Sequence, residues 1–216
     1  MNSHIIPTVF AYSKNSFIDR FEKLIKISKD IQIDIMDGKF VKEASIDIKD
    51  IPDLKKYNNN FEAHLMMENP KNYIERLKKK GFKKIIFHYE ALKHNNEIEK
   101  TIEKIREAKM KVFIALNPET SISRILFFLH KIDGVLFLGV HPGKEHQSFI
   151  PETYEKIKKL REFNNKIEIQ VDGGVNIEVA KKLKEIGVDK VNSGSFVADA
   201  KNPSDIIKRL NVIFEK

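Results

Sequence analysis

The chain has 216 residues, a length that suits one large hydrophobic core and is short for two domains. We therefore expect a single domain over residues 1–216. The absence of cysteine excludes a disulfide framework and thiolate chemistry. No apolar run reaches the roughly 18 residues that a membrane span needs, and the N-terminus lacks the basic-then-apolar pattern of a signal peptide. These features predict a cytoplasmic protein with no membrane partner.

The formal net charge of +8 comes mainly from lysine, since only six of the 39 basic residues are arginine. The lysines are scattered over helix-like segments such as 78–80 and 181–182. Nucleic-acid-binding surfaces cluster arginine with interleaved aromatic residues, and no such stripe occurs in the chain. The charge therefore argues against a nucleic-acid partner. It is compatible with mild attraction of a small anionic substrate such as a phosphate compound.

Short apolar segments alternate with amphipathic segments along the whole chain. The apolar segments are rich in β-branched and aromatic residues, which is typical of strands buried on both faces. In chain order, the predicted strands span residues 5–10, 31–36, 61–66, 84–88, 111–116, 134–138, 167–171 and 190–193. Between them, apolar residues recur at the three- and four-residue spacing of amphipathic helices. The predicted helices span residues 16–28, 97–108, 121–130, 152–163, 177–186 and 204–214. Residues 46–54 allow a short helix, and Asn69-Pro70 and Gly81 fit the start and end of another.

Eight strand–helix units in succession predict parallel strands joined by right-handed crossovers. Such units close into a (β/α)8 barrel, the TIM-barrel class of α/β fold. A doubly wound open sheet is the alternative, but it usually has about five to seven strands and an early glycine-rich phosphate turn. Neither GxGxxG nor GxxxxGK[ST] occurs in the chain, so Rossmann and P-loop folds are disfavoured.

Polar residues follow several predicted strands, at the end where (β/α)8 barrels place their catalytic groups. They are Asp34, Asp37, His64, His88, Glu90, Asn117, His141, Asp172, Ser193 and Ser195. Asp34 lies within an apolar strand, where an ionised carboxylate is expensive unless it is paired or bound to a metal. Asp172 follows strand seven, across the barrel from strand two. Two carboxylates that face one ligand can remove a proton from one face and return one to the other, although a strand-end Asp can also simply anchor a loop.

His64, placed beside Asp34 and Asp172, completes a cluster of oxygen and nitrogen ligands that suits a divalent ion such as Zn, Mn or Fe. The alternative is a purely structural histidine. Barrel phosphate sites form in the loops after strands seven and eight, from backbone N–H groups and a helix N-terminus. The candidate phosphate-binding residues are Gly143, Gly173, Gly174, Gly194 and Ser195. Alternatively, these glycines only form turns.

Seven sets of residues occur in an order and spacing typical of one enzyme family. They are DIMDG at 34–38 with Phe40-Val41, HLM at 64–66, HYEA at 88–91, NPET at 117–120, Pro142-Gly143 with QSF at 147–149, VDGGV at 171–175 and SGS at 193–195. In these stretches, and over nearly its whole length, the chain resembles the ribulose-phosphate 3-epimerase family. Each stretch alone is unspecific, and their order and spacing together carry the resemblance.

The resemblance implies an isomerase of carbohydrate metabolism, in the pentose phosphate pathway, that interconverts D-ribulose 5-phosphate and D-xylulose 5-phosphate. By matching motif, Asp34 and Asp172 take the roles of the aspartates that remove the C3 proton and reprotonate the opposite face of an enediolate. A divalent metal held by these aspartates and His64 stabilises the developing charge, and His64 also contacts the substrate. Met36 and Met66 match methionines that crowd the reacting carbon, or they simply fill the core. We expect a small sugar phosphate as the ligand and a homo-oligomeric assembly.

Several positions depart from the family pattern. The residue two positions before Asp34 is a metal-binding histidine in the family and is Gln32 here, which offers a neutral and weaker carbonyl ligand. Thr8 replaces a serine in the expected substrate-binding set, and Leu138 replaces a third methionine. Residues 143–147 read GKEHQ where the family has GFGGQ. These changes alter the expected metal and phosphate contacts more than the fold.

Three alternatives remain open from the sequence. The first is the same chemistry on another ketose phosphate, such as allulose 6-phosphate. The second is a decarboxylase or aldolase-type lyase, which uses an Asp-x-Lys-x-x-Asp constellation on a strand end. The corresponding stretch DIMD at 34–37 has no lysine, which disfavours this class. The third is a non-catalytic descendant that binds a sugar phosphate or a partner; Gln32 and the altered loop favour it, and the pair of Asp34 and Asp172 disfavours it.

Overall fold

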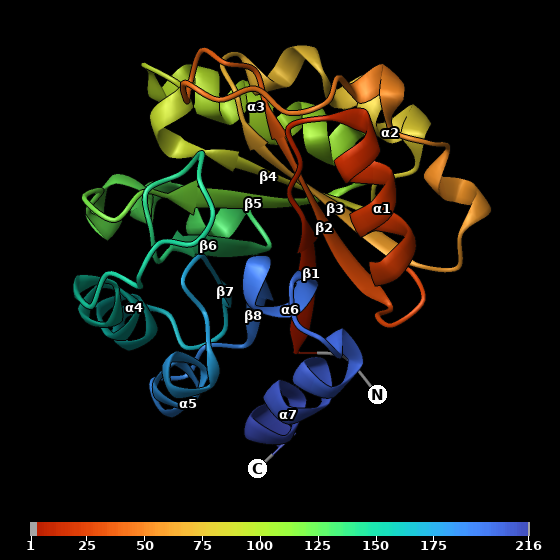
Figure 1. Ribbon diagram of the computed structural model, residues 1–216. Coiled ribbons are helices and arrows are strands. Elements are labelled where there is room, and N and C mark those ends of the chain that lie inside the picture. The colour runs from red at the N-terminus through yellow and green to blue at the C-terminus, as the bar shows by residue number, and fades with distance from the viewer. Residues whose placement is uncertain (1–3, 216) are drawn as a thin grey trace.

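The structure, a computed structural model, describes residues 4–215, and the strands of these residues form one closed parallel barrel (Figure 1). In chain order the strands are β1 (Ile5–Val9), β2 (Asp30–Met36), β3 (Asn60–Met66), β4 (Lys84–His88), β5 (Lys111–Leu116), β6 (Gly134–Leu138), β7 (Glu168–Asp172) and β8 (Lys190–Ser193). Each strand pairs with the next, and β8 pairs with β1 to close the ring. The predicted (β/α)8 barrel is confirmed, and every predicted strand lies within one residue of its expected bounds.

Helices surround the barrel and cover its outer face (Figure 1). The α-helices are α1 (Lys14–Leu24), α2 (Ile74–Lys80), α3 (Asn95–Glu107), α4 (Glu152–Phe163), α5 (Ile177–Glu185), α6 (Ser195–Ala198) and α7 (Pro203–Glu215). Each longer helix buries one apolar face, as α3 buries Ile98, Ile102 and Ile105. Gly81 ends α2 with a φ of 105°, which glycine adopts without a steric penalty. Within residues 4–215, no helix combines the length and the apolar character needed to cross a membrane.

Short 3-10 helices complete several connections between strands. They are η1 (Ile48–Asp50), η2 (Leu54–Lys56), η3 (Pro70–Asn72), η4 (Tyr89–Ala91), η5 (Ile122–Arg124) and η6 (Leu126–Lys131). The prediction of one amphipathic α-helix over 121–130 is wrong, because this segment forms the two 3-10 helices η5 and η6. This segment is rich in β-branched and aromatic residues, which lose side-chain freedom in an α-helix. The short helix allowed within 46–54 is η1, and Pro52 stops its extension because the residue before a proline favours extended backbone.

The barrel interior has an apolar half and a polar half. Alternate side chains of each strand point inward. Those of β4, β5 and β6 form an apolar cluster of Ile86, Phe113, Ala115, Leu136 and Leu138. Strands β2, β3, β7 and β8 instead contribute buried polar side chains, namely Gln32, Asp34, Glu62, His64, Gln170 and Asn192. Several of these side chains hydrogen-bond across the barrel, so the polar half supports the site described next.

Candidate active site

Strand register brings Asp34, His64 and Asp172 into one cluster. Asp34 on β2 pairs directly with His64 on β3, and Asp172 is the last residue of β7. Nδ1 of His64 lies 2.9 Å from Oδ1 of Asp34 and 3.7 Å from Oδ2 of Asp172. Ligand atoms of all three residues lie within 4.8 Å of one another. Two carboxylates and one imidazole therefore face a common space.

Gln32 lies between the two aspartates and is fully buried. Its amide nitrogen donates to Oδ1 of Asp34 at 3.0 Å and to Oδ2 of Asp172 at 2.5 Å. The hydroxyl oxygen of Thr8 lies 3.4 Å from the same nitrogen. The carbonyl oxygen of Gln32 points the other way and accepts from Nδ2 of Asn192 at 2.8 Å. The donor group of Gln32, and not its carbonyl oxygen, thus faces the carboxylates.

A chain of hydrogen bonds determines which ring nitrogen of a neutral His64 carries the proton and which one keeps a lone pair. Glu90 accepts from the backbone N–H of Asn117 at 2.8 Å and lies 3.3 Å from Nδ1 of His88. Because an ionised carboxylate only accepts, Nδ1 of His88 carries a proton, and Nε2 of His88 accepts from Nε2 of His64 at 2.9 Å. The lone pair of a neutral His64 is then on Nδ1, the atom that faces Asp34. His64 is therefore oriented as a cation ligand.

Burial and neighbouring charges set the protonation of this cluster. Burial, followed by the charge of Asp34, raises the pKa of Asp172 to about 7. Burial lowers the pKa of His64, but the hydrogen bond and charge of Asp34 outweigh burial and raise that pKa above its ordinary value. Burial lowers the pKa of His88. Without a cation, Asp34 therefore favours the protonated form of His64, and the carboxyl group of Asp172 exchanges a proton near neutral pH.

The donor set of the cluster fits a divalent cation. Two carboxylate oxygens and one imidazole nitrogen are ligands that Zn, Mn and Fe accept. Two buried negative groups so close together also favour a cation that neutralises them. Asp34, His64 and Asp172 could therefore hold a metal ion. Its binding would displace the proton from Nδ1 of His64, because an imidazole must be neutral to act as a ligand.

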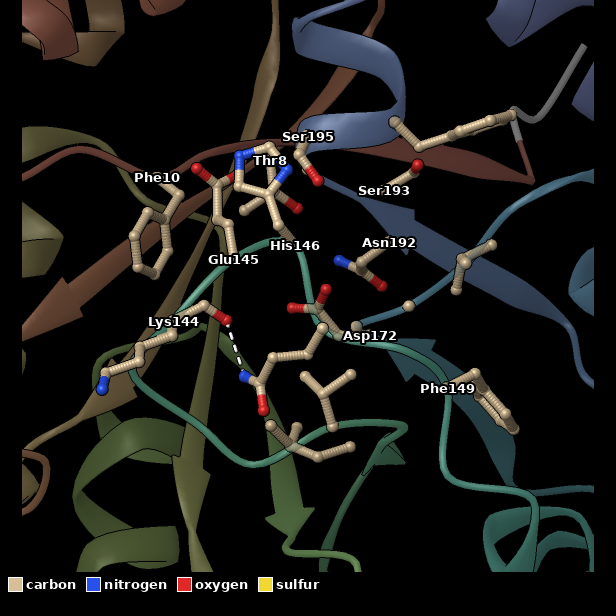
Figure 2. Close-up of a pocket in the computed structure, with 18 of the residues that line it drawn as sticks. Thr8, Phe10, Lys144, Glu145, His146, Phe149, Asp172, Asn192, Ser193 and Ser195 are labelled. Carbon is tan, nitrogen blue, oxygen red and sulfur yellow. Dashed lines mark hydrogen bonds between the residues drawn. The ribbon is translucent and has the colours of Figure 1, made fainter.

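The cluster lines a cavity of about 810 Å³ at the carboxyl ends of the strands. Figure 2 shows Asp172 among the side chains that line this cavity. The residues predicted to bind substrate or phosphate line the same cavity, namely Thr8, Gly143, Gly173, Gly174, Gly194 and Ser195. The hydroxyl of Ser193, also in the lining, is buried without a hydrogen-bond partner among the described residues. A cavity of this volume is within the range of small-molecule sites, and it offers polar groups to a ligand.

Two of the predicted phosphate glycines are also required by the local backbone. Gly173 has a φ of 93°, and a β-carbon there would lie 2.4 Å from the side chain of Val140. Gly174 has a φ of 68°, and a β-carbon there would lie 2.7 Å from the backbone nitrogen of Phe149. The turn and a ligand-binding role are compatible, since a backbone without side chains also lets a ligand approach closely.

Apolar side chains form one wall of the cavity. Phe10, Met66 and Leu138 line it, and Met36 packs with Phe10, Met66 and Val41 in one buried cluster. Of the two methionines predicted for this wall, Met66 reaches the cavity and Met36 belongs to the cluster behind it. An apolar wall of this kind limits the access of water to a reacting carbon.

Glu145 and Arg20 are site residues that motif matching did not find. Arg20 on α1 donates through Nη1 to both carboxylate oxygens of Glu145, at 2.8 and 2.9 Å, and through Nη2 to Asp199 at 3.1 Å. A β-carbon at Gly194 would lie only 3.0 Å from an oxygen of Glu145. Burial raises the pKa of Glu145, and Arg20 opposes the rise. The altered loop at 143–147 was the only sequence signal, and it did not indicate that a carboxylate covers a predicted phosphate loop.

Asp37 and His141 lie apart from the cluster. The carboxylate of Asp37 accepts from the backbone N–H groups of Phe40 and Glu68, so this residue anchors the loops after β2 and β3. His141 is exposed in the lining of the cavity and pairs with Glu119 at 2.6 Å. Among the strand-end candidates, these two therefore contribute to loop structure and to the cavity rim.

Sequence comparison finds relatives along nearly the whole chain. The model of the ribulose-phosphate 3 epimerase family matches residues 5–198. A ribulose-phosphate 3-epimerase of Schizosaccharomyces pombe is 30% identical over 215 residues, which cover 97% of this chain and 93% of that protein. A ribulose-phosphate 3-epimerase of Aquifex aeolicus is 30% identical over 204 residues, which cover 92% of this chain and 90% of that protein.

Solved structures with the same architecture are more distant in sequence. KGPDC from Streptococcus mutans matches with a TM-score of 0.76 at 12% identity, over 100% of this chain and 98% of that one. A variant tryptophan synthase α-subunit from Pyrococcus furiosus matches with a TM-score of 0.69 at 16% identity, over 99% of this chain and 97% of that one. At such identities the likeness shows the barrel fold alone.

Proposed function

The chain belongs to the ribulose-phosphate 3-epimerase family, and on this premise we propose that it inverts carbon 3 of a ketose phosphate. We propose D-ribulose 5-phosphate and D-xylulose 5-phosphate as the pair that it interconverts. The observation that carries the proposal is the convergence of the Asp34 and Asp172 carboxylates beside His64, at the base of a cavity that a sugar phosphate can enter.

Inversion of a carbon next to a carbonyl needs two acid–base groups. One takes the proton, and the other returns a proton to the opposite face. Asp34 comes from β2 and Asp172 from β7, so a sugar carbon between them would meet a carboxyl group on each side. We assign proton removal to Asp34 in one direction and to Asp172 in the other.

A divalent cation is part of the proposed site. Asp34, His64 and Asp172 would hold it, and Zn, Mn and Fe all suit these ligands. When bound, such an ion stabilises the negative charge that develops on the substrate oxygens. The hydrogen bond that His64 donates to His88 would keep the imidazole oriented toward the cation.

The remainder of the cavity would bind the two ends of the substrate differently. The phosphate group is proposed to lie against Gly173, Gly174, Gly194 and Ser195, with Gly143 and Thr8 nearby. Backbone N–H groups at glycine-rich turns and at a helix N-terminus are suited to such a group. Met66, supported by Met36, would cover the reacting carbon on its apolar side and limit proton exchange with water.

Deuterium incorporation at carbon 3 tests the proposed function. The protein is incubated with D-ribulose 5-phosphate and diamagnetic Zn²⁺ in heavy water, and the C3 proton is followed by NMR. We expect its signal to disappear as D-xylulose 5-phosphate forms. Asp34→Asn and Asp172→Asn should each lower the rate about 100- to 10,000-fold, the usual range for loss of a general acid or base. Asp205→Asn, in the first turn of α7, is the matched control and should retain the rate.

Other outcomes separate the remaining hypotheses. Exchange with D-allulose 6-phosphate but not with the pentulose phosphate would retain the chemistry and change the substrate. The absence of exchange with every pentulose and hexulose phosphate, across several divalent metals, would refute the enzymatic proposal and favour a sugar-phosphate-binding protein.

A further inference from the structure

A run of buried polar side chains crosses the barrel interior and ends at the two aspartates of the site. Its members are Lys84, Glu62, Gln170, Asn192 and Gln32, and each is at most 8% exposed. Nζ of Lys84 lies 2.7 Å from Oε2 of Glu62 and donates to Oε1 of Gln170 at 2.8 Å. The run thus connects a buried ion pair to the side chains that would handle protons and the cation.

The lysine end determines the direction of the hydrogen bonds in this run. A lysine only donates, so Gln170 accepts through its oxygen and donates through its nitrogen to Oδ1 of Asn192 at 3.1 Å. Asn192 then donates through Nδ2 to Oε1 of Glu62 and to Oε1 of Gln32, both at 2.8 Å. The nitrogen of Gln32 is consequently the atom left to face the aspartates.

The carboxylate end sets the same direction independently. When they hold a cation the two carboxylates are ionised and only accept, and the nitrogen of Gln32 lies 3.0 Å from an oxygen of Asp34 and 2.5 Å from an oxygen of Asp172. Turning the amide over would place its oxygen against two carboxylate oxygens and its nitrogen against Nδ2 of Asn192. Because a buried polar group without a hydrogen-bond partner is destabilising, both neighbours of the amide oppose that rotation.

We propose that Gln32 is a fixed hydrogen-bond donor that holds Asp34 and Asp172 together, and that Asn192 is the positioning residue that keeps the Gln32 oxygen turned away from the cation. A cation then has only three protein ligands, and its other positions stay open for substrate oxygens. The neutral donor reduces the repulsion between the carboxylates without adding a ligand. The part played by substrate rests on the proposed function, whereas the role of Gln32 is tested by cation binding alone.

The first experiment compares Mn²⁺ binding to the wild-type chain and to Gln32→Leu by calorimetry. The leucine removes both the donor and any ligand at this position. If Gln32 is only a donor, Gln32→Leu should bind Mn²⁺ as the wild type does or up to about five-fold more tightly, because the amide competes with the cation for carboxylate lone pairs. Binding weakened about ten-fold or more would show that the Gln32 amide supports cation binding, as a ligand or as an orienting group, and would overturn the proposal. Gln147→Leu, which removes an amide that bonds to loop carbonyls of the same cavity, is the matched control.

A second measurement uses the wild-type protein and does not depend on how a variant folds. In a crystal structure with Zn²⁺ bound, we expect three protein ligands and no Gln32 atom within ligand distance. A Gln32 oxygen at about 2.0–2.2 Å from the ion would refute the donor role. Either result stands whether or not the protein turns over a ketose phosphate, so failure of this inference is distinguishable from failure of the proposed function.

Asn192→Leu tests the positioning role. A leucine cannot donate to Gln32, so nothing keeps the amide oxygen turned away, and the amide is expected to turn and offer its oxygen to the cation. In this background, the added change Gln32→Leu should weaken Mn²⁺ binding about ten-fold, although the same change has no weakening effect in the wild type; such non-additivity reports coupling between contacting residues. If Gln32→Leu has the same effect in both backgrounds, Asn192 does not set the orientation of Gln32.

Discussion

Nε2 of His64 lies 2.9 Å from Nε2 of His88, and both rings are buried. Two ring nitrogens at this distance need one donor and one acceptor. Glu90, on the far side of His88, determines which ring donates, because its carboxylate accepts a hydrogen bond from Nδ1–H of His88. Nε2 of His88 is then the acceptor. His88 thereby orients His64 toward the cation site without contacting a cation itself.

We therefore expect His88→Leu to weaken Mn²⁺ or Zn²⁺ binding about 10- to 100-fold, as loss of a group that orients a metal ligand usually does. Calorimetric titration measures the effect, and circular dichroism checks the fold of the variant. His141→Leu, which removes an exposed histidine of the cavity lining, should bind the cation as the wild type does. If His88→Leu stays within about two-fold of the wild type, the hydrogen bond between the two rings does not prepare the site.

Asp172 is expected to destabilise the cation-free protein at neutral and higher pH. Its pKa is raised from 3.8 to about 7, so between these values the folded protein keeps a proton that the unfolded chain has released. The free energy of unfolding therefore falls as the pH rises from about 4 to about 7. Asp172→Asn removes this dependence. We expect the variant to gain on the order of 2 kcal/mol at pH 8 and little at pH 4.

Urea unfolding in the presence of EDTA at pH 4, 6 and 8 measures this difference between Asp172→Asn and the wild type. Saturating Zn²⁺ should reverse the order at pH 8, because the cation stabilises only a folded protein that binds it. A variant whose gain is the same at all three pH values would contradict the assigned ionisation of Asp172.

The strands were predictable because their burial produces a local pattern in the sequence. Segments such as 84–88 and 111–116 are apolar on consecutive positions, and the structure has strands there with the same bounds. The ends of these strands then indicated where polar side chains collect, since parallel strands in a barrel all end at one face. Asp34, His64 and Asp172 were found in this way, and the structure brings them together.

Contacts between side chains that are far apart in the sequence produce no such pattern. The link between Lys84 and Gln170 joins residues 86 positions apart, and that between Arg20 and Glu145 joins residues 125 positions apart. Neither has a periodic pattern, because each is a single contact between side chains of elements that are distant in the sequence. The orientation of the Gln32 side-chain amide could not be predicted for the same reason, because it depends on side-chain groups of other strands.

The buried pair of Lys84 and Glu62 should matter for stability more than a surface ion pair does. Lys84→Met leaves the Glu62 carboxylate buried with amide donors only, and we expect a loss of about 3 kcal/mol, in the range for a broken buried pair. Lys84→Met with Glu62→Gln should recover about half of that loss, because the remaining charge is removed as well. Denaturant unfolding measures both, with Lys181→Met on the exposed face of α5 as the control. Additive losses in the double variant would mean that the two charges do not act as a pair.

Glu145 lies where the phosphate group is proposed to bind, and we expect Glu145→Gln to improve substrate binding. The change removes a negative charge beside Gly194 and keeps an oxygen that accepts from Arg20. Because like charges repel strongly in a partly buried site, KM for D-ribulose 5-phosphate should fall about three- to ten-fold at low salt, with kcat within about two-fold. Steady-state kinetics measure the change, and Glu119→Gln, at an exposed carboxylate, is the control. A KM that rises instead would indicate that Glu145 binds the sugar and that the phosphate group lies away from Gly194.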